Sequence, residues 1–319
     1  MKKLAVLTSG GDSPGMNACI RAVVRSSIYY GIEVIGVKRG YEGLIHKDFE
    51  VMDASSVGDI VHKGGTILKT ARSKAFMTEE GRNQAIKHLK EEGIEGLIVI
   101  GGDGSFKGAA KLSEAGIATI GIPGTIDNDL AYTDYTIGFD TAVNTVLDSI
   151  SKIRDTSTSH EKATIIEVMG RHCGDIAMYA GVAGGAEAII IPEKPFSLPS
   201  IIEKMEHGRK RGKQHHIIIL AEGSSKAEDL RQQLVDATGE DARISVLGFI
   251  QRGGDPSAFD RVLASRLGLK AVELLKEGEG KLALGVRQNQ LVFEDIHEAL
   301  SKEKSYDPEL DRLAEILSI

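Results

Sequence analysis

Two glycine-glycine-aspartate turns constrain the fold of this chain more than any other feature. Gly10-Gly11-Asp12 closely follows an apolar run at residues 4–7, and Gly101-Gly102-Asp103 directly follows another at residues 96–100. Short apolar runs bounded by turn residues are typical of buried strands in a parallel sheet, and a helical pattern follows each turn. The chain is therefore predicted to be an α/β protein with glycine-rich turns at the carboxyl ends of its strands.

A third turn carries two carboxylates. Residues 120–123 form an apolar run that leads through Gly124 and Thr125 to Asp127 and Asp129. Two carboxylates two residues apart in extended backbone point the same way, and a cation, a proton or a substrate hydroxyl must separate their charges. One of them is expected to act as a base and the other as a metal ligand. A turn that only caps the next element would use the same residue types, so that interpretation stays open here.

Length and composition set the frame for these turns. A chain of 319 residues with 41% hydrophobic and 27% charged residues is expected to form two globular α/β domains. No apolar run approaches the roughly 20 residues of a membrane span, and the first residues lack a signal peptide. The net charge of -7 disfavours nucleic acid as a partner. Cys19 and Cys173 fit neither a disulfide framework nor a zinc site, which favours a reducing cytoplasm.

The glycine turns are predicted to cradle phosphates. Glycines let the backbone approach a phosphate, and the helix that follows offers free N–H groups and a positive dipole end. Neither turn is a dinucleotide fingerprint or a Walker A motif, so a dehydrogenase and a P-loop enzyme are both disfavoured. Together with Asp127 and Asp129, the two turns predict a nucleoside triphosphate site with Mg²⁺ between carboxylates and phosphate oxygens. A tight turn without a ligand would also use glycines.

The second half of the chain repeats the strand-helix pattern with different strand ends. A helix is expected over residues 138–154, followed by the polar residues 156–160, and a last helix over residues 308–317. The strand ends between them carry Arg171, Glu222, Arg243 and Arg252. Arginines with one acid suit a sugar phosphate, because guanidinium groups bind phosphate bidentately and a carboxylate accepts from hydroxyls. Taken singly, each arginine is as well explained by a surface ion pair.

These motifs resemble the bacterial-type ATP-dependent 6-phosphofructokinases. The match spans almost the whole chain, in order and at the family's spacing. It rests on the following segments: Leu7-Thr8-Ser9-Gly10-Gly11-Asp12, Gly101-Gly102-Asp103-Gly104-Ser105, Pro123-Gly124-Thr125-Ile126-Asp127-Asn128-Asp129, Met169-Gly170-Arg171 and Gln251-Arg252-Gly253-Gly254.

The resemblance implies a fold and an assembly. It implies two similar Rossmann-like three-layer α/β/α domains with mostly parallel sheets. Residues 1–138 with 251–301 would form the ATP-binding domain, and residues 139–250 with 302–319 the fructose 6-phosphate-binding domain. It also implies a homotetramer, a dimer of dimers, whose active sites are completed by a neighbouring subunit.

The resemblance further implies the role of each site residue. Asp127 would take the proton from the sugar 1-hydroxyl, with Arg72, Thr125 and Arg171 as the other catalytic residues, and Asp103 with Asp129 would hold Mg²⁺. The residues that would bind ATP are Gly11, Arg72, Ser73, Gly102, Asp103, Gly104, Ser105 and Gly108. Those that would bind fructose 6-phosphate are Thr125, Asp127, Asp129, Met169, Gly170, Arg171, Glu222, Arg252 and, from the neighbouring subunit, Arg243.

An effector site for ADP or phosphoenolpyruvate is implied in the same way. Arg21 and Arg25 lie on one helix face, and a basic run at residues 209–213 is able to converge with them on a phosphate. A solvated basic helix end is the alternative. The residues that match the family's effector pattern are Arg21, Arg25, Asp59, Arg154, Gly185, Glu187, Arg211, Lys213 and His215.

Departures from the family pattern keep two other functions in view. Lys162 replaces an arginine and Phe249 replaces a histidine near the sugar phosphate, which leaves a nucleotide-binding sensor with weakened catalysis as an alternative. The intact Asp103, Asp127 and Asp129 speak against that alternative. A pyrophosphate-dependent phosphofructokinase has an acidic residue at the position of Gly104 and a lysine at that of Gly124, so both glycines favour ATP. Ala54 replaces a basic residue at the effector site, and Lys69 and Phe106 are smaller changes near the nucleotide loops.

Overall fold

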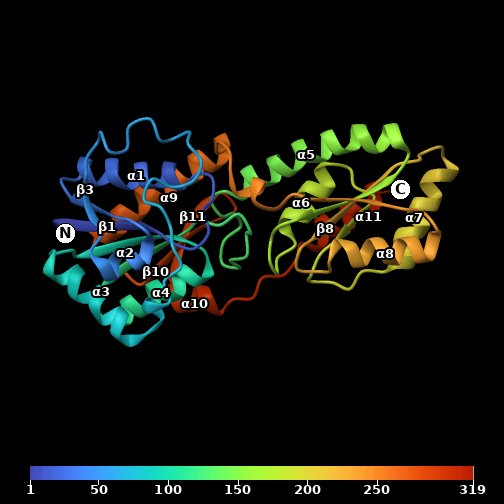
Figure 1. The fold of residues 1–319 in the computed structure, drawn as a ribbon. Helices are drawn as coiled ribbons and strands as arrows, with labels where there is room; N and C mark the ends of the chain where they lie inside the picture. Colours follow the sequence, from blue (N-terminus) through green and yellow to red (C-terminus); the bar gives the residue numbers. More distant parts are fainter. Residues whose placement is uncertain (319) are drawn as a thin grey trace. The chain divides into compact units, whose positions relative to one another are not determined.

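The computed structural model describes residues 1–318, which fall into two compact units, each with its own sheet (Figure 1). The first unit holds residues 1–126, 130–141 and 252–303, and the second holds residues 127–129, 142–251 and those from 304 onward. The chain thus passes between the units after residues 141, 251 and 303. Residues 127–129 pack with the second unit although their neighbours on both sides belong to the first.

The first unit is built on a seven-stranded sheet in the order β11-β10-β5-β4-β1-β2-β3. The five inner strands are parallel, and β3 and β11 pair antiparallel at the two edges. The strands are β1 (Lys3–Thr8), β2 (Glu33–Val37), β3 (Phe49–Met52), β4 (Gly96–Gly101), β5 (Ala118–Pro123), β10 (Leu282–Arg287) and β11 (Gln290–Asp295).

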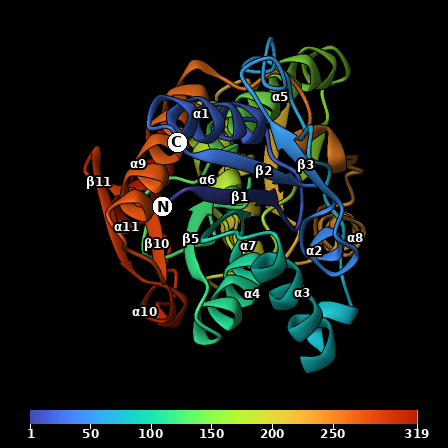
Figure 2. The ribbon, with the colours of Figure 1, turned by 90° about the vertical axis from the view of Figure 1, so that its left-hand side faces the viewer.

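Helices cover both faces of this sheet, which gives three layers (Figure 2). Leu4 and Val6 of β1 point into the core beneath α1 (Met16–Tyr29) and α9 (Ala258–Lys276). The alternate residues Ala5 and Leu7 belong to the opposite core, as the period of a strand requires. That core lies under the remaining helices, α2 (Gly40–His46), α3 (Glu79–Glu91), α4 (Asp103–Glu114) and α10 (Ile296–Ser301), with the short turn η1 (Ala75–Met77).

The second unit contains a four-stranded parallel sheet in the order β7-β8-β6-β9. Ile190 packs with Ile201 of α7 on one face, and Ile189 lies against Gly181 of α6 on the other. Besides most of α5 (Phe139–His160), the elements of this unit are β6 (Ala163–Val168), α6 (Asp175–Ala183), β7 (Ala188–Ile190), α7 (Leu198–Lys210), β8 (His216–Ala221), α8 (Ala227–Thr238), β9 (Arg243–Val246) and α11 (Pro308–Leu317). The short turn η2 (Gly248–Arg252) leads back to the first unit.

The predicted mixed α/β fold with mostly parallel sheets is confirmed, and one helix is longer than expected. Helix α5 (Phe139–His160) continues through residues 156–160, which the sequence had placed after its end. The hydroxyls of Thr158 and Ser159 donate to the carbonyls of Arg154 and Asp155, four residues back. Polar side chains that usually compete with a helix are thereby satisfied inside it. Among residues 1–318, no helix combines the length and apolar character that crossing a bilayer requires.

Candidate active site

The predicted nucleotide loops of the first unit meet at one edge of its sheet. Strands β5, β4 and β1 are neighbours, and Gly101 pairs with Pro123 while Thr8 pairs with Ile100. The ladder continues past the strand ends, because Ser9 N donates to Ile100 O and Gly124 N donates to Gly101 O, both at 3.0 Å. The three turns that follow are therefore held side by side at the carboxyl ends of the strands, where open α/β sheets bind ligands.

Close packing explains why several of these positions are glycine. A Cβ atom at Gly101 would lie 2.5 Å from the carbonyl oxygen of Ser9, and one at Gly108 would lie 2.6 Å from the ring of Tyr41. A Cβ atom at Gly124 would meet Ile100 at 2.9 Å. Gly104, in the first turn of α4, has no atom within 4 Å of such a Cβ. The space beside Gly104 is open to a ligand, whereas the other three glycines are also needed by the fold.

Asp103 begins α4 and faces solvent in part. Its carboxylate accepts from Lys107 Nζ at 2.7 Å, one turn further along the helix. Within residues 1–318, no group of three or more His, Cys, Asp or Glu side chains is assembled in the way a protein-only metal site requires. Mg²⁺ commonly takes one or two carboxylates and completes its shell with water and substrate phosphates, so the donor chemistry of Asp103 and Asp129 fits this ion.

Three further predicted site residues belong to segments beside the first glycine turn or the loop bonded to it. Arg252 Nη1 donates to Asp12 O at 3.1 Å, and its guanidinium fills the space that a side chain at Gly11 would occupy. This arginine, predicted to bind the sugar phosphate, belongs to the first unit. Arg72 is exposed, in a loop tied to the first glycine turn by Thr70 Oγ1, which donates to Gly10 O at 2.7 Å. Ser73 Oγ accepts from Phe76 N at 3.1 Å, which turns the chain into η1.

Thr125 and Asp127 follow β5 on either side of a unit boundary. Thr125 is buried, and its carbonyl accepts from Thr136 Oγ1 at 2.6 Å. A Cβ atom at Gly102 would lie 3.4 Å from Thr125, so the second glycine turn and the third are in contact. The Asp127 side chain is only 2% exposed, and Oδ2 lies 3.3 Å from Arg171 Nε. A buried carboxylate is thus held beside a cation at the end of the strand.

Asn128, between the two aspartates, fixes the turn. It adopts a left-handed conformation with φ 53°, which asparagine tolerates better than most residues. Its Nδ2 donates to Asp175 Oδ2 at 2.7 Å, and the same oxygen lies 3.0 Å from Lys304 Nζ. Sequence reasoning missed Asp175 and Lys304, because both are far along the chain and only folding brings them to the turn.

The strand ends of the second unit place Arg171 beside Glu222. Strands β6 and β8 are neighbours, and Arg171 N donates to Glu222 Oε1 at 3.0 Å. A Cβ atom at Gly223 would lie 1.8 Å from Arg171 O, so the glycine allows this approach. Met169 N donates to Gln251 Oε1 at 3.2 Å. The second unit therefore gathers Asp127, Met169, Gly170, Arg171 and Glu222 from the predicted sugar-phosphate set.

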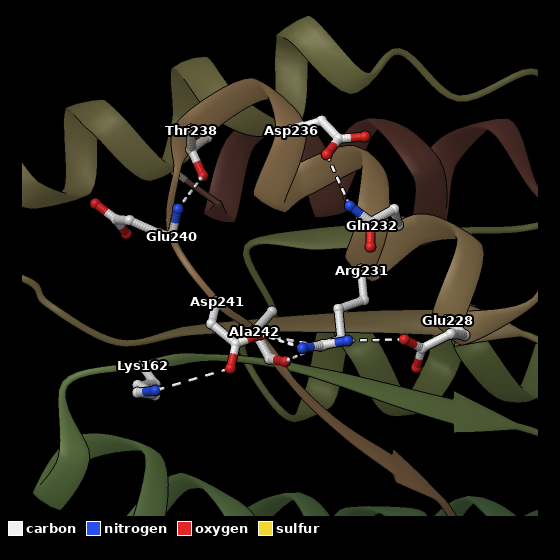
Figure 3. Close-up of polar contacts among 9 residues, drawn as sticks. All are labelled: Lys162, Glu228, Arg231, Gln232, Asp236, Thr238, Glu240, Asp241 and Ala242. Carbon is white, nitrogen blue, oxygen red and sulfur yellow. Dashed lines mark hydrogen bonds and ion pairs between the residues drawn. The ribbon is translucent and has the colours of Figure 1, made fainter.

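Lys162 and Arg243 lie apart from this group. Lys162 directly precedes β6, and Arg243 is the first residue of β9, which pairs with β6. Figure 3 shows Lys162 facing Asp241, with Nζ 3.9 Å from Oδ2. Asp241 also binds Arg231 at 2.7 Å, and Arg231 in turn binds Glu228 at 2.7 Å. Arg243 Nη1 donates to Thr156 Oγ1 at 3.3 Å. Within the single chain, Lys162 therefore forms an ion pair with Asp241.

The residues of the predicted effector site are divided between the units. Arg154 donates to Gly185 O at 3.0 Å, and Lys213 pairs with the buried carboxylate of Glu187. The pKa of His215 is lowered by burial and by the Lys213 charge. The second unit holds Arg154, Gly185, Glu187, Arg211, Lys213 and His215, and the first holds Arg21, Arg25 and Asp59.

Glycine-rich turns and helix starts at the ends of parallel strands, with an aspartate-rich turn beside them, define an α/β protein built to bind phosphates. The family model described as phosphofructokinase matches residues 3–275. The chain belongs to the phosphofructokinase family.

Full-length relatives carry a more specific name. The chain is 61% identical over 319 residues to a protein of Alkaliphilus metalliredigens (strain QYMF) and 58% identical to one of Clostridioides difficile (strain 630). Both are named ATP-dependent 6-phosphofructokinase, and both matches cover 100% of each chain.

Solved structures show the same fold. Phosphofructokinase from Saccharomyces cerevisiae is 35% identical with a TM-score of 0.89, over 100% of this chain and 48% of that one. A pyrophosphate-dependent phosphofructokinase from Marinobacter aquaeolei is 25% identical with a TM-score of 0.84, over 97% of this chain and 86% of that one. The shared fold therefore includes members with different phosphoryl donors.

Proposed function

We propose that this chain transfers a phosphoryl group from Mg-ATP to the 1-hydroxyl of D-fructose 6-phosphate, giving fructose 1,6-bisphosphate and ADP. The observation that carries the proposal is the buried Asp127 carboxylate beside Arg171, two residues after Thr125 and the nucleotide loops of the first unit. The full-length relatives named ATP-dependent 6-phosphofructokinase support both the reaction and the donor.

Asp127 is the general base in this proposal. A carboxylate that accepts the proton of the sugar 1-hydroxyl makes the oxygen nucleophilic as it attacks the γ-phosphorus. Arg171 keeps the carboxylate in place through its contact at 3.3 Å and remains half exposed, so its guanidinium is also able to meet an incoming phosphate. Thr125 and Arg72 would orient the transferring group.

The nucleotide would lie along the first and second glycine turns. The free N–H groups at the start of α4, from Gly102 to Ser105, suit an anionic phosphate chain, and Gly104 leaves room for it. Mg²⁺ held by Asp103 and Asp129 would neutralise charge on the phosphate oxygens. Lys107 must leave Asp103 for this to happen, which a flexible and exposed lysine is able to do.

The open space beside Gly104 favours ATP over pyrophosphate. The fold has room for an acidic side chain at position 104, yet the chain has glycine there. The longer, negatively charged phosphate chain of ATP therefore meets no carboxylate at this position. Gly124 is less informative, because the contact with Ile100 restricts any side chain at that position whatever the donor.

Regulation, assembly and location are part of the same proposal. The site around Glu187, Lys213 and Arg154 offers cations for ADP or phosphoenolpyruvate, and Arg21, Arg25 and Asp59 would complete it. A homotetramer, a dimer of dimers in the cytoplasm, would let Lys162 and Arg243 reach a neighbouring sugar-phosphate site.

One assay tests the reaction. ADP release is measured by enzyme coupling with ATP, with and without fructose 6-phosphate, and phosphate release is measured with pyrophosphate as donor. The proposal expects sugar-dependent turnover with ATP only. Nucleotide binding without sugar-dependent turnover would instead support a sensor, and turnover with pyrophosphate would reassign the donor.

A further inference from the structure

The start of α5 is held by a buried carboxylate from another helix. Asp260, in the first turn of α9, is fully buried. Its Oδ1 accepts from Gly138 N at 2.8 Å, and its Oδ2 accepts from Thr141 N at 2.9 Å and from Thr141 Oγ1 at 2.5 Å. Because α5 begins at Phe139, these N–H groups belong to the residue before the helix and to its third residue. Asp260 thus replaces the capping side chain that Gly138 lacks.

The capped segment is itself a brace for the aspartate-rich turn. Ile137 N donates to Pro123 O at 2.9 Å, and Ile137 forms a bridge with Gly124. Thr136 Oγ1 donates to Thr125 O at 2.6 Å. Three consecutive residues therefore link Asp260 to the end of β5 and the turn after it: Gly138 bonds Asp260, Ile137 bonds Pro123, and Thr136 bonds Thr125.

Asp260 also lies beside Gly15, the residue before α1. A Cβ atom at Gly15 would lie 2.6 Å from Ile137 and 3.6 Å from the Asp260 side chain, so these three residues pack together. At the start of α9, Ser257 N donates to Thr141 Oγ1 at 2.9 Å, and Ser257 Oγ donates to Asp140 at 2.5 Å. Gly15 before α1, Ile137 and the start of α9 thus lie around one buried carboxylate.

We propose that Asp260 is a positioning residue for phosphoryl transfer, which holds Thr125, and Asp127 two residues beyond it, in their reactive placement through the brace at residues 136–138. The inference rests on the proposed function. A shift of about 1 Å in a reacting group is able to cost on the order of 10²-fold in rate, so a residue that touches no substrate can still control turnover.

The test compares Asp260→Asn, Asp260→Ala and Thr136→Val with the parent. Asparagine keeps the shape of the side chain, but its amide N–H would face a backbone N–H of Gly138 or Thr141. Alanine removes both carboxylate acceptors. Valine at position 136 removes only the hydrogen bond to Thr125 O. We expect kcat to fall about tenfold for Asp260→Asn and more for Asp260→Ala, with the KM for ATP changed less than about threefold. Thr119→Val is the matched control, since Thr119 is equally buried and bonds Ala109 O away from the brace.

A double-mutant cycle separates positioning from general stability. If Asp260 and Thr136 act along one path, the loss in kcat for the combined Asp260→Asn and Thr136→Val variant is smaller than the product of the single losses. A folded Asp260→Asn protein with parental kcat and a lowered Tm would overturn the proposal, as would fully independent effects.

A readout that needs no substrate accompanies the kinetics. Hydrogen exchange of the backbone amides at residues 136–141 should accelerate in both Asp260 variants and stay parental in Thr119→Val. If the amides of residues 136–141 exchanged at the parental rate in the Asp260 variants, the proposal that Asp260 holds this segment would be wrong. A parent that exchanges as expected but turns over no fructose 6-phosphate would instead point to failure of the proposed function.

Discussion

The Asp127 carboxylate is deeply buried and contacts the Arg171 guanidinium. A general base acts in the transition state and contributes little to nucleotide binding, so Asp127→Asn should lower kcat by on the order of 10²–10⁴ and leave the KM for ATP nearly unchanged. Steady-state kinetics at saturating sugar measure both values. Asp148→Asn is the control, because its carboxylate is exposed on α5 and pairs with Lys152. A loss of less than tenfold would remove Asp127 from the role of base.

Two substitutions of Gly104 distinguish an effect on ligand binding from an effect on folding. Because no atom beyond the neighbouring residues and the backbone of α4 lies within 4 Å of an added Cβ, both Gly104→Ala and Gly104→Asp should fold like the parent. The aspartate would place a negative charge in the proposed path of the ATP phosphates, so ATP-dependent turnover should collapse at least 10²-fold, while alanine should retain most of it. Thermal unfolding and the ADP-release assay measure the two effects. If Gly104→Asp used ATP as well as Gly104→Ala, this residue would not line the nucleotide site.

At the scale of elements, strand β8 begins with a buried histidine, His216. His216 is 1% exposed, and neither ring nitrogen has a hydrogen-bond partner among residues 1–318. Burial lowers the pKa of His216 to about 4, with Arg209, Lys213 and His215 adding to the effect and Glu187 opposing it. The unfolded state then binds more protons than the folded state between pH 4 and about 6.5.

The protein is therefore more stable at neutral than at acid pH. The free energy of unfolding has its full contribution from neutral His216 above pH 6.5 and loses about 2–4 kcal/mol as the pH falls toward 4. The free energy of unfolding of His216→Leu should therefore depend less on pH over this range than that of the parent. Denaturant unfolding at several pH values measures the free energies. Parallel curves for His216→Leu and the parent would show that this histidine does not titrate with unfolding.

Helix α5 and its cap illustrate how an element is fixed from outside itself. The sequence at residues 136–141 offers Gly138 where a capping side chain is usual, and the missing acceptor comes from α9, more than a hundred residues later. Local propensity therefore gives the position of the helix, while the placement of its first turn depends on tertiary contacts.

At the scale of the whole molecule, Phe249 is a feature that the single chain does not explain. It is 80% exposed in η2, among other exposed apolar residues, Val246 and Ile250. By the family resemblance, a histidine at this position of the proposed tetramer would meet the sugar 6-phosphate. Phe249→His should then lower the KM for fructose 6-phosphate by roughly tenfold with little change in kcat, because a hydrogen bond to a charged group contributes about 1.5–3 kcal/mol.

The companion variant is Lys162→Arg. An arginine is able to bind phosphate bidentately, and its gain should be limited by Asp241, which engages residue 162 in the single chain. Sugar-phosphate titrations at saturating Mg-ATP for the parent, both single variants and the double variant measure each effect and their coupling. If Phe249→His leaves KM within twofold, residue 249 does not face the phosphate.

The sequence by itself determined the buried strands and the glycine-rich turns that follow them. The apolar run at residues 96–100 is a buried strand, because a strand covered on both faces needs apolar residues at every position. Gly101 and Gly104 could be singled out as part of a phosphate-binding turn, although one is required by packing and the other is open to a ligand. The long helix α5 was cut short in the prediction, since Ser and Thr side chains satisfied within a helix look the same as those in a loop.

Only the tertiary structure decided which residues share a site. It placed Arg252 against Asp12, Asp127 beside Arg171, and residues 127–129 with the second unit, although sequence neighbours of that turn pack with the first. It also joined Asn128 to Asp175 and Lys304, and Gly138 to Asp260. None of these pairs has a local signature, because hydrogen bonds and ion pairs between distant segments form only when burial excludes water from partners that no periodic pattern relates.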